Sequence, residues 1–248
     1  MLQKFFSLNK QLCRIITRFL PFQEDLFEAY DHQVAFYMNS KKEQLVADIG
    51  GGKKCTFAKY RDRSLNTKII TVDISKEEME YNRDTDQKIV ANVVDGLPFE
   101  NEAIDMLVSR SVLEHLTDVE AFVRNARKAL KKGGLFISVF PSKFALFSLI
   151  NQMFSSKYSK RLSHFFFPEK KGECGFPAFY KKCYYTAIKS CLERNGFEIL
   201  EIRVSYFQSP YFGFFAPFFL MSLCYEMIIR TLNIKNLAAY LMVTAKKI

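Results

Sequence analysis

The 248-residue sequence has no tryptophan, only three histidines, and six cysteines that form no C-x-x-C pair. His32, His115 and His164 cannot build a His-rich metal site, and the cysteine spacing fits neither a zinc site nor a disulfide framework. The first residues also lack the unbroken apolar stretch and small-residue cleavage site of a secretory signal. We therefore expect no metal and a reduced, cytoplasmic setting.

Acidic residues are comparatively scarce, with 26 Asp and Glu against 36 Lys and Arg, which gives a formal charge of +10. An anionic partner fits this charge, whether nucleic acid, an anionic membrane or a phosphorylated substrate. An ordinary lysine-rich, solvated surface fits it equally well. The hydrophobic fraction of 49% excludes a globally disordered chain, and the 26 phenylalanines call for an explanation.

Residues 2–20 contain no acidic side chain, and the first acid of the chain is Glu24. Their apolar positions include Phe5, Leu8, Leu12, Ile15, Ile16 and Phe19, and their basic positions are Lys4, Lys10, Arg14 and Arg18. The apolar spacings of three and four predict an amphipathic helix within an N-terminal helical cap at 1–40. Its apolar face either lies on an anionic membrane surface or packs against the rest of the protein.

Five short apolar segments, each bounded by turn residues, follow this cap. They are Leu45–Ile49, Lys68–Val72, Lys88–Ala91, Ile104–Ser109 and Leu135–Phe140. Their length and their β-branched or aromatic content are typical of buried parallel strands. Helical spacing in Asp118–Lys132 indicates that helices alternate with these strands and cover both faces of the sheet.

The end of the chain breaks this alternation. Tyr185–Asn195 predicts a helix that stops at Gly196, while Phe197–Tyr206 and Ala239–Ala245 predict two strands. Because no βα unit separates these strands, we expect them to pair antiparallel. The predicted fold is α/β and Rossmann-like, a doubly wound, mostly parallel seven-stranded sheet with an antiparallel last strand, over 41–248.

Two aromatic insertions interrupt this domain, at 143–183 and 207–236. The first holds eight Lys and Arg against two Glu, and its phenylalanines include Phe144, Phe147, Phe154, Phe165, Phe166, Phe167 and Phe176. The second overlaps the uncharged stretch Val204–Tyr225, but prolines and a glycine interrupt it, so it predicts a helix from Pro217 rather than a membrane span. We expect a lid and acceptor pocket, whose aromatics pack together or meet an amphiphilic substrate.

A glycine-rich turn, Asp48-Ile49-Gly50-Gly51-Gly52, follows the first predicted strand directly. Glycines let a ligand approach the backbone, and the helix expected next would offer its positive N-terminus. A nicotinamide-binding turn would need a further glycine where the sequence has Cys55, and its pyrophosphate would disfavour Asp48. S-adenosylmethionine has no phosphate and presents an ammonium and a sulfonium, which an acid at the strand end can assist.

Polar residues also end the second and third predicted strands. Asp73 lies about twenty residues after the glycines, where a carboxylate accepts hydrogen bonds from both ribose hydroxyls. Asn92 is placed to meet the adenine amino group while Val93 covers the ring, and Asp95 is the alternative partner. These positions, together with Ile74, indicate a nucleoside site.

Four segments resemble, in order and spacing, class I S-adenosylmethionine-dependent methyltransferases of the methyltransferase type 11, ubiquinone-biosynthesis-like group: VADIGGGKK, ITVDIS, LPFENEAIDMLVSRSVLEHLTDVEAF and ARKALKKGGLFISVFPS. NGFEI and AAYLMVTAKK extend the resemblance to the closing strands. It implies S-adenosylmethionine as cofactor, with contacts from Asp48, Gly50, Gly52, Asp73, Asn92 and Val93, and with the backbone of Ser109 and Arg110 closing the methionine side. The sequence departs from this family at Lys54, commonly glycine, and at Asn92, more commonly Asp.

His115, which follows the fourth predicted strand, is the candidate catalytic residue. Methyl transfer is an in-line displacement in which alignment alone can contribute about 7–11 kcal/mol, so a base is needed only if the acceptor must lose a proton. His115 is either that base or a residue that orders the cofactor pocket, and we favour the second role.

The function expected is methyl transfer to a small-molecule, glycan or lipid-linked acceptor, with peripheral contact at the inner face of an anionic membrane. No Asn/Asp-Pro-Pro-Tyr/Phe tetrapeptide follows the fourth strand and no Pro-Cys nucleophile is present, so nucleic-acid bases are disfavoured as acceptors. An RNA or protein methyltransferase is an alternative that the charge supports. A non-catalytic cofactor-binding protein is another, against which the intact Asp48, Gly52 and Asp73 argue.

Overall fold

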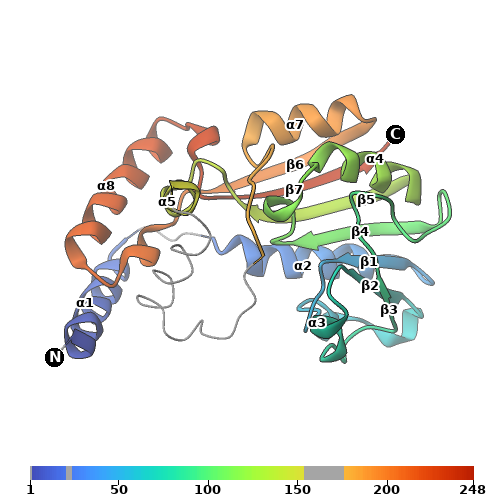
Figure 1. Ribbon diagram of the computed structural model, residues 1–248, viewed down its shortest axis with the longest axis horizontal. Coiled ribbons are helices and arrows are strands. Elements are labelled where there is room, and N and C mark those ends of the chain that lie inside the picture. Colours follow the sequence, from blue (N-terminus) through green and yellow to red (C-terminus); the bar gives the residue numbers. More distant parts are fainter. Residues whose placement is uncertain (1, 21–23, 154–175) are drawn as a thin grey trace.

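The computed structural model describes residues 2–20, 24–153 and 176–248, arranged around one seven-stranded sheet (Figure 1). The strands are β1 Leu45–Ile49, β2 Lys68–Asp73, β3 Gln87–Val90, β4 Ile104–Arg110, β5 Leu130–Pro141, β6 Phe197–Ser205 and β7 Tyr240–Lys247. The α-helices are α1 Leu2–Thr17, α2 Leu26–Met38, α3 Lys76–Glu80, α4 Val119–Ala129, α5 Leu146–Met153, α7 Tyr185–Arg194 and α8 Ala216–Thr231. Short 3₁₀ helices are η1 Ala58–Tyr60, η2 Arg63–Leu65, η3 Leu113–His115, η5 Ser209–Phe212 and η6 Lys235–Leu237.

The strand order is β3-β2-β1-β4-β5-β7-β6. Strands β1 to β5 pair in parallel, whereas β7 runs antiparallel to both β5 and β6. The predicted doubly wound sheet with a reversed last strand is therefore confirmed. The strand order reverses between β1 and β4, and in open α/β sheets the crevice at such a point is where ligands bind.

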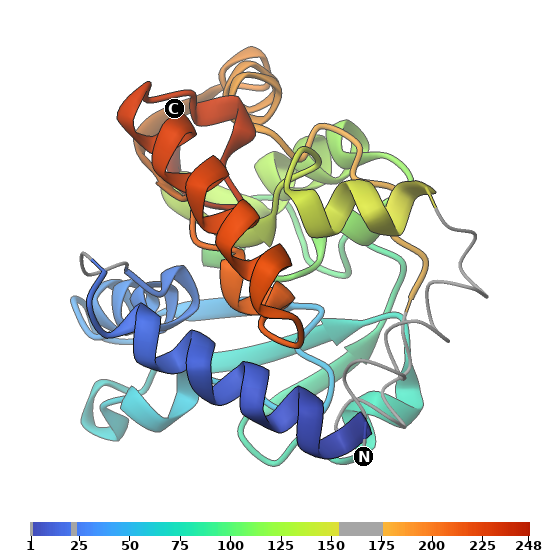
Figure 2. The same cartoon turned by 90° about the vertical axis from the view of Figure 1, so that its left-hand side faces the viewer.

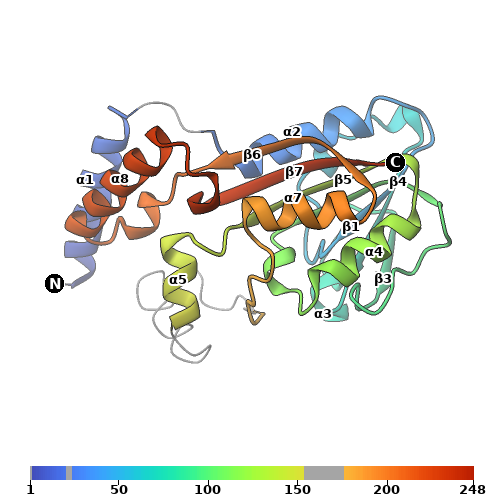
Figure 3. The same cartoon turned by 90° about the horizontal axis from the view of Figure 1, so that it is seen from above.

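Helices cover both faces of the sheet, with α2 on one face and α4 and α7 on the other (Figure 3). Successive residues of β4 pack on opposite faces of the sheet, because side chains alternate along a strand. Leu107 packs in the cluster that contains α4 and α7, while Met106 and Val108 pack in the cluster that contains α2. Asp118 caps α4 by accepting a hydrogen bond from the Ala121 amide at 3.0 Å.

The helix expected directly after the glycine turn is not there, and this prediction was wrong. Residues 50–67 hold only the two 3₁₀ helices η1 and η2. The segment has no apolar stripe at helical spacing, and its buried apolar side chains are Cys55 and Phe57. Helix α2, which precedes β1, covers this face of the sheet instead. A ligand at the turn therefore meets backbone amides and side chains rather than a helix N-terminus.

Helix α8 is attached to the edge of the sheet at which the parallel strands end, because it connects the end of β6 to the start of β7 (Figure 1). The buried Glu226 fixes it there by accepting hydrogen bonds from the backbone amides of Gln208, at 2.8 Å, and Ser209. Its other oxygen accepts from the Ser209 hydroxyl at 3.1 Å. Glu226 is therefore present in this largely apolar helix because it binds the turn at Gln208 and Ser209.

Helix α1 lies beside α8, and Figure 2 looks onto the pair in front of the sheet. Cys13 of α1 packs with Phe219 and Leu223 of α8. The Asn9 side chain accepts a hydrogen bond from the Ala216 amide at 2.8 Å, at the first turn of α8. Among the described residues, no helix is both long and apolar enough to cross a membrane.

Candidate functional site

A cavity of about 250 Å³ lies where β1 to β4 end, beside the point at which the strand order reverses. Its walls come from the turns after these strands and from 176–179. Of the predicted site residues, it gathers Gly50, Asp73, Ile74, Asn92, Val93 and His115. Strand geometry thus brings together positions that are more than sixty residues apart in the sequence.

The glycine turn passes so close to its neighbours that side chains have no room there. Gly50 has a φ of +68°, and a Cβ on it would come within 2.3 Å of Cγ2 of Val112. A Cβ on Gly51 would come within 2.3 Å of Oδ2 of Asp48. The predicted need for glycine at this turn therefore has a steric cause at both positions.

Two backbone amides fix the Asp73 carboxylate at the edge of the cavity. Its Oδ2 accepts a hydrogen bond from Gly52 at 3.0 Å, and its Oδ1 accepts from Ser75 at 2.9 Å. A carboxylate has about four lone-pair positions, so each oxygen can accept one further donor. Ile74 lines the cavity next to this carboxylate and is 60% exposed.

The turn after β3 joins the two alternative adenine partners. The Asn92 side chain donates to Oδ2 of Asp95 at 2.7 Å and accepts from the Val94 amide at 3.2 Å. Asn125 of α4 donates to the carbonyls of Val93 and Val94, both at 3.0 Å. Asn92 and Val93 therefore line the cavity in a fixed arrangement.

Asp48 lies beneath the glycine turn, only 4% exposed, and its Oδ2 has no hydrogen-bond partner among the described residues. Loss of hydration on burial raises the pKa of this carboxyl to about 7, and a hydrogen bond with Cys55 partly opposes that rise. A buried acid without a partner is costly, because its charge has lost water and gained little in return. A cation placed in the neighbouring cavity would stabilise its ionised form.

The side chains of Ser109 and Arg110 point away from the cavity. The fully buried Ser109 hydroxyl shares a hydrogen bond of 2.7 Å with that of Ser138. The Arg110 guanidinium lies 5.0 Å from the centre of the Phe27 ring and 3.8 Å from an oxygen of Asp31. The next residues of the same loop, Ser111 and Val112, line the cavity instead. The predicted backbone contact at Ser109 and Arg110 stays a prediction.

His115 faces the cavity with a defined proton arrangement. Its Nδ1 lies 2.9 Å from the carbonyl oxygen of Pro177, which can only accept, so Nδ1 carries the proton. Burial lowers the pKa of the imidazole. Nε2 of the neutral ring therefore holds a lone pair, 3.7 Å from Oε1 of Glu114.

Glu114 is a site residue that the sequence named only as the neighbour of His115. It is 3% exposed, one carboxyl oxygen has no partner among the described residues, and burial raises its pKa to about 8. Its backbone carbonyl accepts hydrogen bonds from Phe179 at 2.7 Å and Tyr180 at 3.0 Å. The burial thus comes from a segment more than sixty residues further along, which no local pattern around Glu114 could indicate.

Asn82 is a second residue that the sequence reasoning missed. It is fully buried, and its side-chain amide donates to the carbonyl oxygens of Gly51 at 3.3 Å and Gly52 at 3.2 Å. Its own oxygen accepts from the Asp84 amide at 3.0 Å. Asn82 therefore holds the glycine turn without lining the cavity itself, and an asparagine in a loop gives no periodic signal by which to find it.

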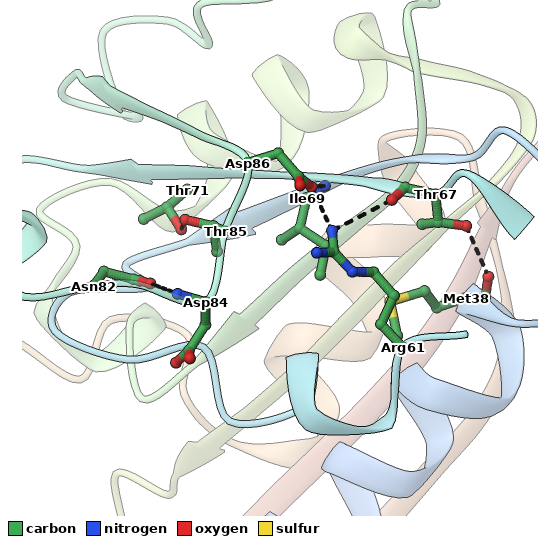
Figure 4. Close-up of polar contacts among 9 residues, drawn as sticks. All are labelled: Met38, Arg61, Thr67, Ile69, Thr71, Asn82, Asp84, Thr85 and Asp86. Carbon is green, nitrogen blue, oxygen red and sulfur yellow. Dashed lines mark hydrogen bonds and ion pairs between the residues drawn. The ribbon is translucent and has the colours of Figure 1, made fainter. Parts of the chain in front are cut away.

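The loop that carries Asn82 is itself fastened to β2, as Figure 4 shows. Thr85 and Thr71 share a hydrogen bond of 3.1 Å between their hydroxyls. Asp86 accepts from the Ile69 amide at 2.7 Å and pairs with Arg61. These contacts place Asn82 rigidly against the glycine turn.

A second, more open hollow of about 710 Å³ lies at the other edge of the sheet, where β1 and β2 begin. Leu45 and Lys68 belong to its wall, together with the Arg61–Asp86 pair. Ligands of this architecture bind at the carboxyl ends of the strands, so we assign the site to the smaller cavity. Of the aromatic insertion, His164 and Phe165–Phe167 lie outside the described residues.

Residues 47–138 match the methyltransferase domain family. The uncharacterized protein MJ0638 of Methanocaldococcus jannaschii is 31% identical over 107 residues, which are 43% of this chain. The chain spans about 45% of the length of that relative.

Solved structures share the fold at low sequence identity. Geranyl diphosphate C-methyltransferase from Streptomyces coelicolor A3(2), in complex with Mg²⁺, geranyl diphosphate and S-adenosyl-L-homocysteine, has a TM-score of 0.58 and 13% identity, with 89% of this chain and 77% of that chain covered. The [4+2]-cyclase SpnF has a TM-score of 0.55 and 16% identity, with 88% and 79% covered. Residues 47–138 therefore match a methyltransferase domain, and the chain shares the fold of solved methyltransferases.

Proposed function

We propose that this protein transfers the methyl group of S-adenosylmethionine to an amphiphilic small-molecule, glycan or lipid-linked acceptor. The observation that carries the proposal is the cavity at the ends of β1 to β4, where a glycine turn, the Asp73 carboxylate and the Asn92–Val93 turn meet. These groups suit the amino-acid, ribose and adenine parts of the cofactor, in that order along the sheet.

The described residues fit the charge and the hydrogen-bonding needs of S-adenosylmethionine. Asp73 keeps two acceptor positions, as two ribose hydroxyls require. The unpartnered Oδ2 of Asp48 lies beside the turn, where a cationic ligand compensates its burial. Gly50 lines the cavity, so a ligand there meets its backbone without an intervening side chain.

The acceptor side is argued from the aromatic end of the cavity. Phe176, Pro177 and Phe179 contribute apolar surface beside the polar His115. Apolar walls with a few polar groups are typical of small-molecule sites. The geranyl diphosphate C-methyltransferase, whose ligand joins a prenyl chain to a diphosphate, supports an acceptor of mixed character.

The cofactor, when bound, supplies a methyl group already activated on a sulfonium. The protein has to align the acceptor with this methyl group and to exclude water, and the aromatic wall contributes to both. Where the acceptor must lose a proton, Nε2 of His115 has the lone pair to receive it. Without the cofactor, the neighbouring Glu114 holds its own proton below about pH 8. We place this reaction in the cytoplasm, at the inner face of a membrane.

Transfer of label from methyl-labelled S-adenosylmethionine tests the proposal. The purified protein is incubated with lipid extract, with RNA and with unfolded protein in parallel, with Asp73→Ala as the matched inactive control. We expect label in the organic-soluble fraction with wild type only. Label in RNA or protein would instead assign the enzyme to the alternative that its +10 charge supports.

One further alternative has a specific basis, since the [4+2]-cyclase SpnF has the same fold. A chain of this fold can therefore serve other chemistry, and fold alone does not fix the reaction. Cofactor binding with no label in any fraction would favour a protein that binds S-adenosylmethionine without transferring its methyl group.

A further inference from the structure

Helix α1 presents its apolar stripe to solvent rather than to the protein. The stripe, called here the α1 outer face, consists of Phe5, Leu8, Leu12, Ile15 and Phe19, which are 45%, 58%, 49%, 46% and 85% exposed. Phe5, Leu8, Leu12 and Ile15 follow spacings of three and four, so they share one side of the helix, and Phe19 lies in the turn after it. Soluble helices ordinarily bury such a stripe, but among the described residues these five side chains stay largely open to solvent.

A different stripe of α1 holds the helix in place. Cys13 is 4% exposed and packs with Phe219 and Leu223, while Asn9 binds the first turn of α8. Because these contacts use another side of α1, they fix the outer face outward. Of the two interpretations left open by the sequence, packing against the protein holds for Ile16, which lies against the Cys13 cluster, while the outer face is open to solvent among the described residues.

The apolar surface continues from α1 onto α8 through aromatic rings. The centre of the Phe215 ring lies 6.4 Å from that of Phe5 and 5.0 Å from that of Phe218. Further along α8, Met221 and Ile228 are 68% and 58% exposed. Within 204–225, Phe212 and Phe219 are buried, and the exposed side chains of α8 are chiefly those of Leu, Met and Ile.

The charges around the outer face are all of one sign. Lys4, Arg14 and Arg18 are exposed on α1, and residues 2–20 contain no acid. The next acid, Glu24, lies 3.1 Å from Arg203 and is paired with it. A second copy of this chain would set these bases against one another, whereas an anionic lipid surface complements them and accepts the apolar side chains.

We propose that the α1 outer face, extended by α8, is a docking surface for an anionic membrane. Helix α8 joins the end of β6 to the start of β7, so it lies at the sheet edge where the cofactor cavity opens. Docking therefore brings that edge toward the membrane, as an amphiphilic acceptor requires. The inference deepens the proposed function, but vesicle binding requires neither cofactor nor acceptor, so its failure is distinguishable from failure of methyl transfer.

Flotation of the full chain with vesicles tests this surface. One set of vesicles is phosphatidylcholine alone, and the other contains roughly a third phosphatidylserine. We expect binding to the anionic set that weakens steeply as salt is raised from about 0.05 to 0.5 M, because the Debye length shortens. Arg14→Gln and Arg18→Gln, made as separate variants, should each reduce the partition coefficient about fivefold.

The apolar contribution is tested with Leu8→Ser combined with Leu12→Ser, which should weaken anionic binding by at least about tenfold. Phe36→Ser is the matched control, because Phe36 is 71% exposed on α2, away from this surface. All these side chains are exposed, so melting temperatures should stay close to that of wild type, and S-adenosylmethionine affinity should not change.

Three results would overturn the proposal. The first is wild-type protein that stays unbound to anionic vesicles at low salt. The second is Leu8→Ser/Leu12→Ser binding as tightly as Phe36→Ser. The third is a wild-type dimer, measured by light scattering, that this double substitution dissociates, because the outer face would then be covered by a second copy.

Discussion

The glycine turn and the α1–α8 pair lie at the same edge of the sheet, yet they are built on opposite principles. At the turn, Asp73 holds the backbone through one hydrogen bond and Asn82 through two, and Gly50 has no space for a side chain. On the helix pair, Leu8 and Met221 offer apolar area that many other side chains could supply. One region depends on a few irreplaceable atoms, and the other on summed area and charge.

This difference predicts how the two regions respond to substitution. Hydrogen bonds at the turn are directional, so loss of one partner there should have a large effect on cofactor binding and none on vesicles. Apolar area is roughly additive, so single changes on α1 should each have modest effects on vesicle binding and none on the cofactor. A substitution that disturbs both regions would break the comparison.

The largest effect is expected from Asp73→Ala. Loss of a charged acceptor from two ribose hydroxyls should weaken S-adenosylmethionine binding by about 1.5–3 kcal/mol, which is about ten- to hundredfold. Asp73→Asn, which keeps acceptor oxygen for the Gly52 or Ser75 amide, should lose less. Titration calorimetry measures both, and equal affinities for wild type and Asp73→Ala would refute the assignment of the ribose site.

Asn82→Ala should come next, with about tenfold weaker cofactor binding and about 1–3 kcal/mol lower stability, because two glycine carbonyls lose their donor. Thr85→Val is the matched control, since it removes the contact with Thr71 from the same loop but leaves the turn untouched. If Thr85→Val lowers affinity as much as Asn82→Ala, the loop as a whole is responsible rather than the asparagine.

Cofactor affinity should rise with pH between about 6 and 8, by up to tenfold per unit for each proton released. Burial raises the pKa of Asp48 to about 7 and that of Glu114 to about 8, and a cation in the cavity favours both ionised forms. Affinity that is flat over this range would contradict the placement of a cation there, and Asp48→Asn should flatten the lower part of the profile.

The stability of the unliganded protein should change in the opposite direction and fall as the pH rises. The folded protein keeps the Asp48 and Glu114 protons that the unfolded chain releases above about pH 4. The free energy of unfolding from this source is therefore greatest at low pH and falls as the pH rises through the two raised pKa values. Urea denaturation across this range measures it, with Asp48→Asn as the reference.

The smallest effect is expected from His115→Asn, about threefold in both affinity and turnover. The imidazole orders the cavity wall through Pro177, and a pocket-ordering residue affects binding and turnover together. Steady-state kinetics combined with calorimetry separates the two quantities. A strong loss of turnover at unchanged affinity would show instead that His115 is a general base.

Much of the cofactor half could be predicted because its signals are local. Strand β1 has the predicted bounds Leu45–Ile49, and Asp73 ends β2 beside the glycine turn, as expected from the sequence. Parallel strands carry continuous apolar runs, and tight turns carry glycine, so composition and conformation coincide at these positions. The antiparallel direction of β7 could also be predicted, because the sequence shows no βα unit between the last two strands.

The remainder depends on contacts between distant segments. The burial of Glu114 requires residues near 180, and the role of Asn82 depends on a loop fastened to β2. Nor could helical spacing alone decide which side of α1 meets α8, because an amphipathic pattern gives a face but not the surface opposite it. The absence of a helix after Gly52 could have been predicted, because the segment lacks an apolar stripe at helical spacing. The glycine motif, which is usually followed by a helix, pointed the other way.

The central claim is that S-adenosylmethionine binds at the carboxyl ends of β1 to β4. Titration calorimetry of the wild-type chain with S-adenosylmethionine, beside Asp73→Ala at the same pH, tests it most directly. The account predicts saturable binding at one site, weakened about ten- to hundredfold by the substitution. No heat of binding by wild type at about 1 mM cofactor, or binding that Asp73→Ala leaves unchanged, would contradict it.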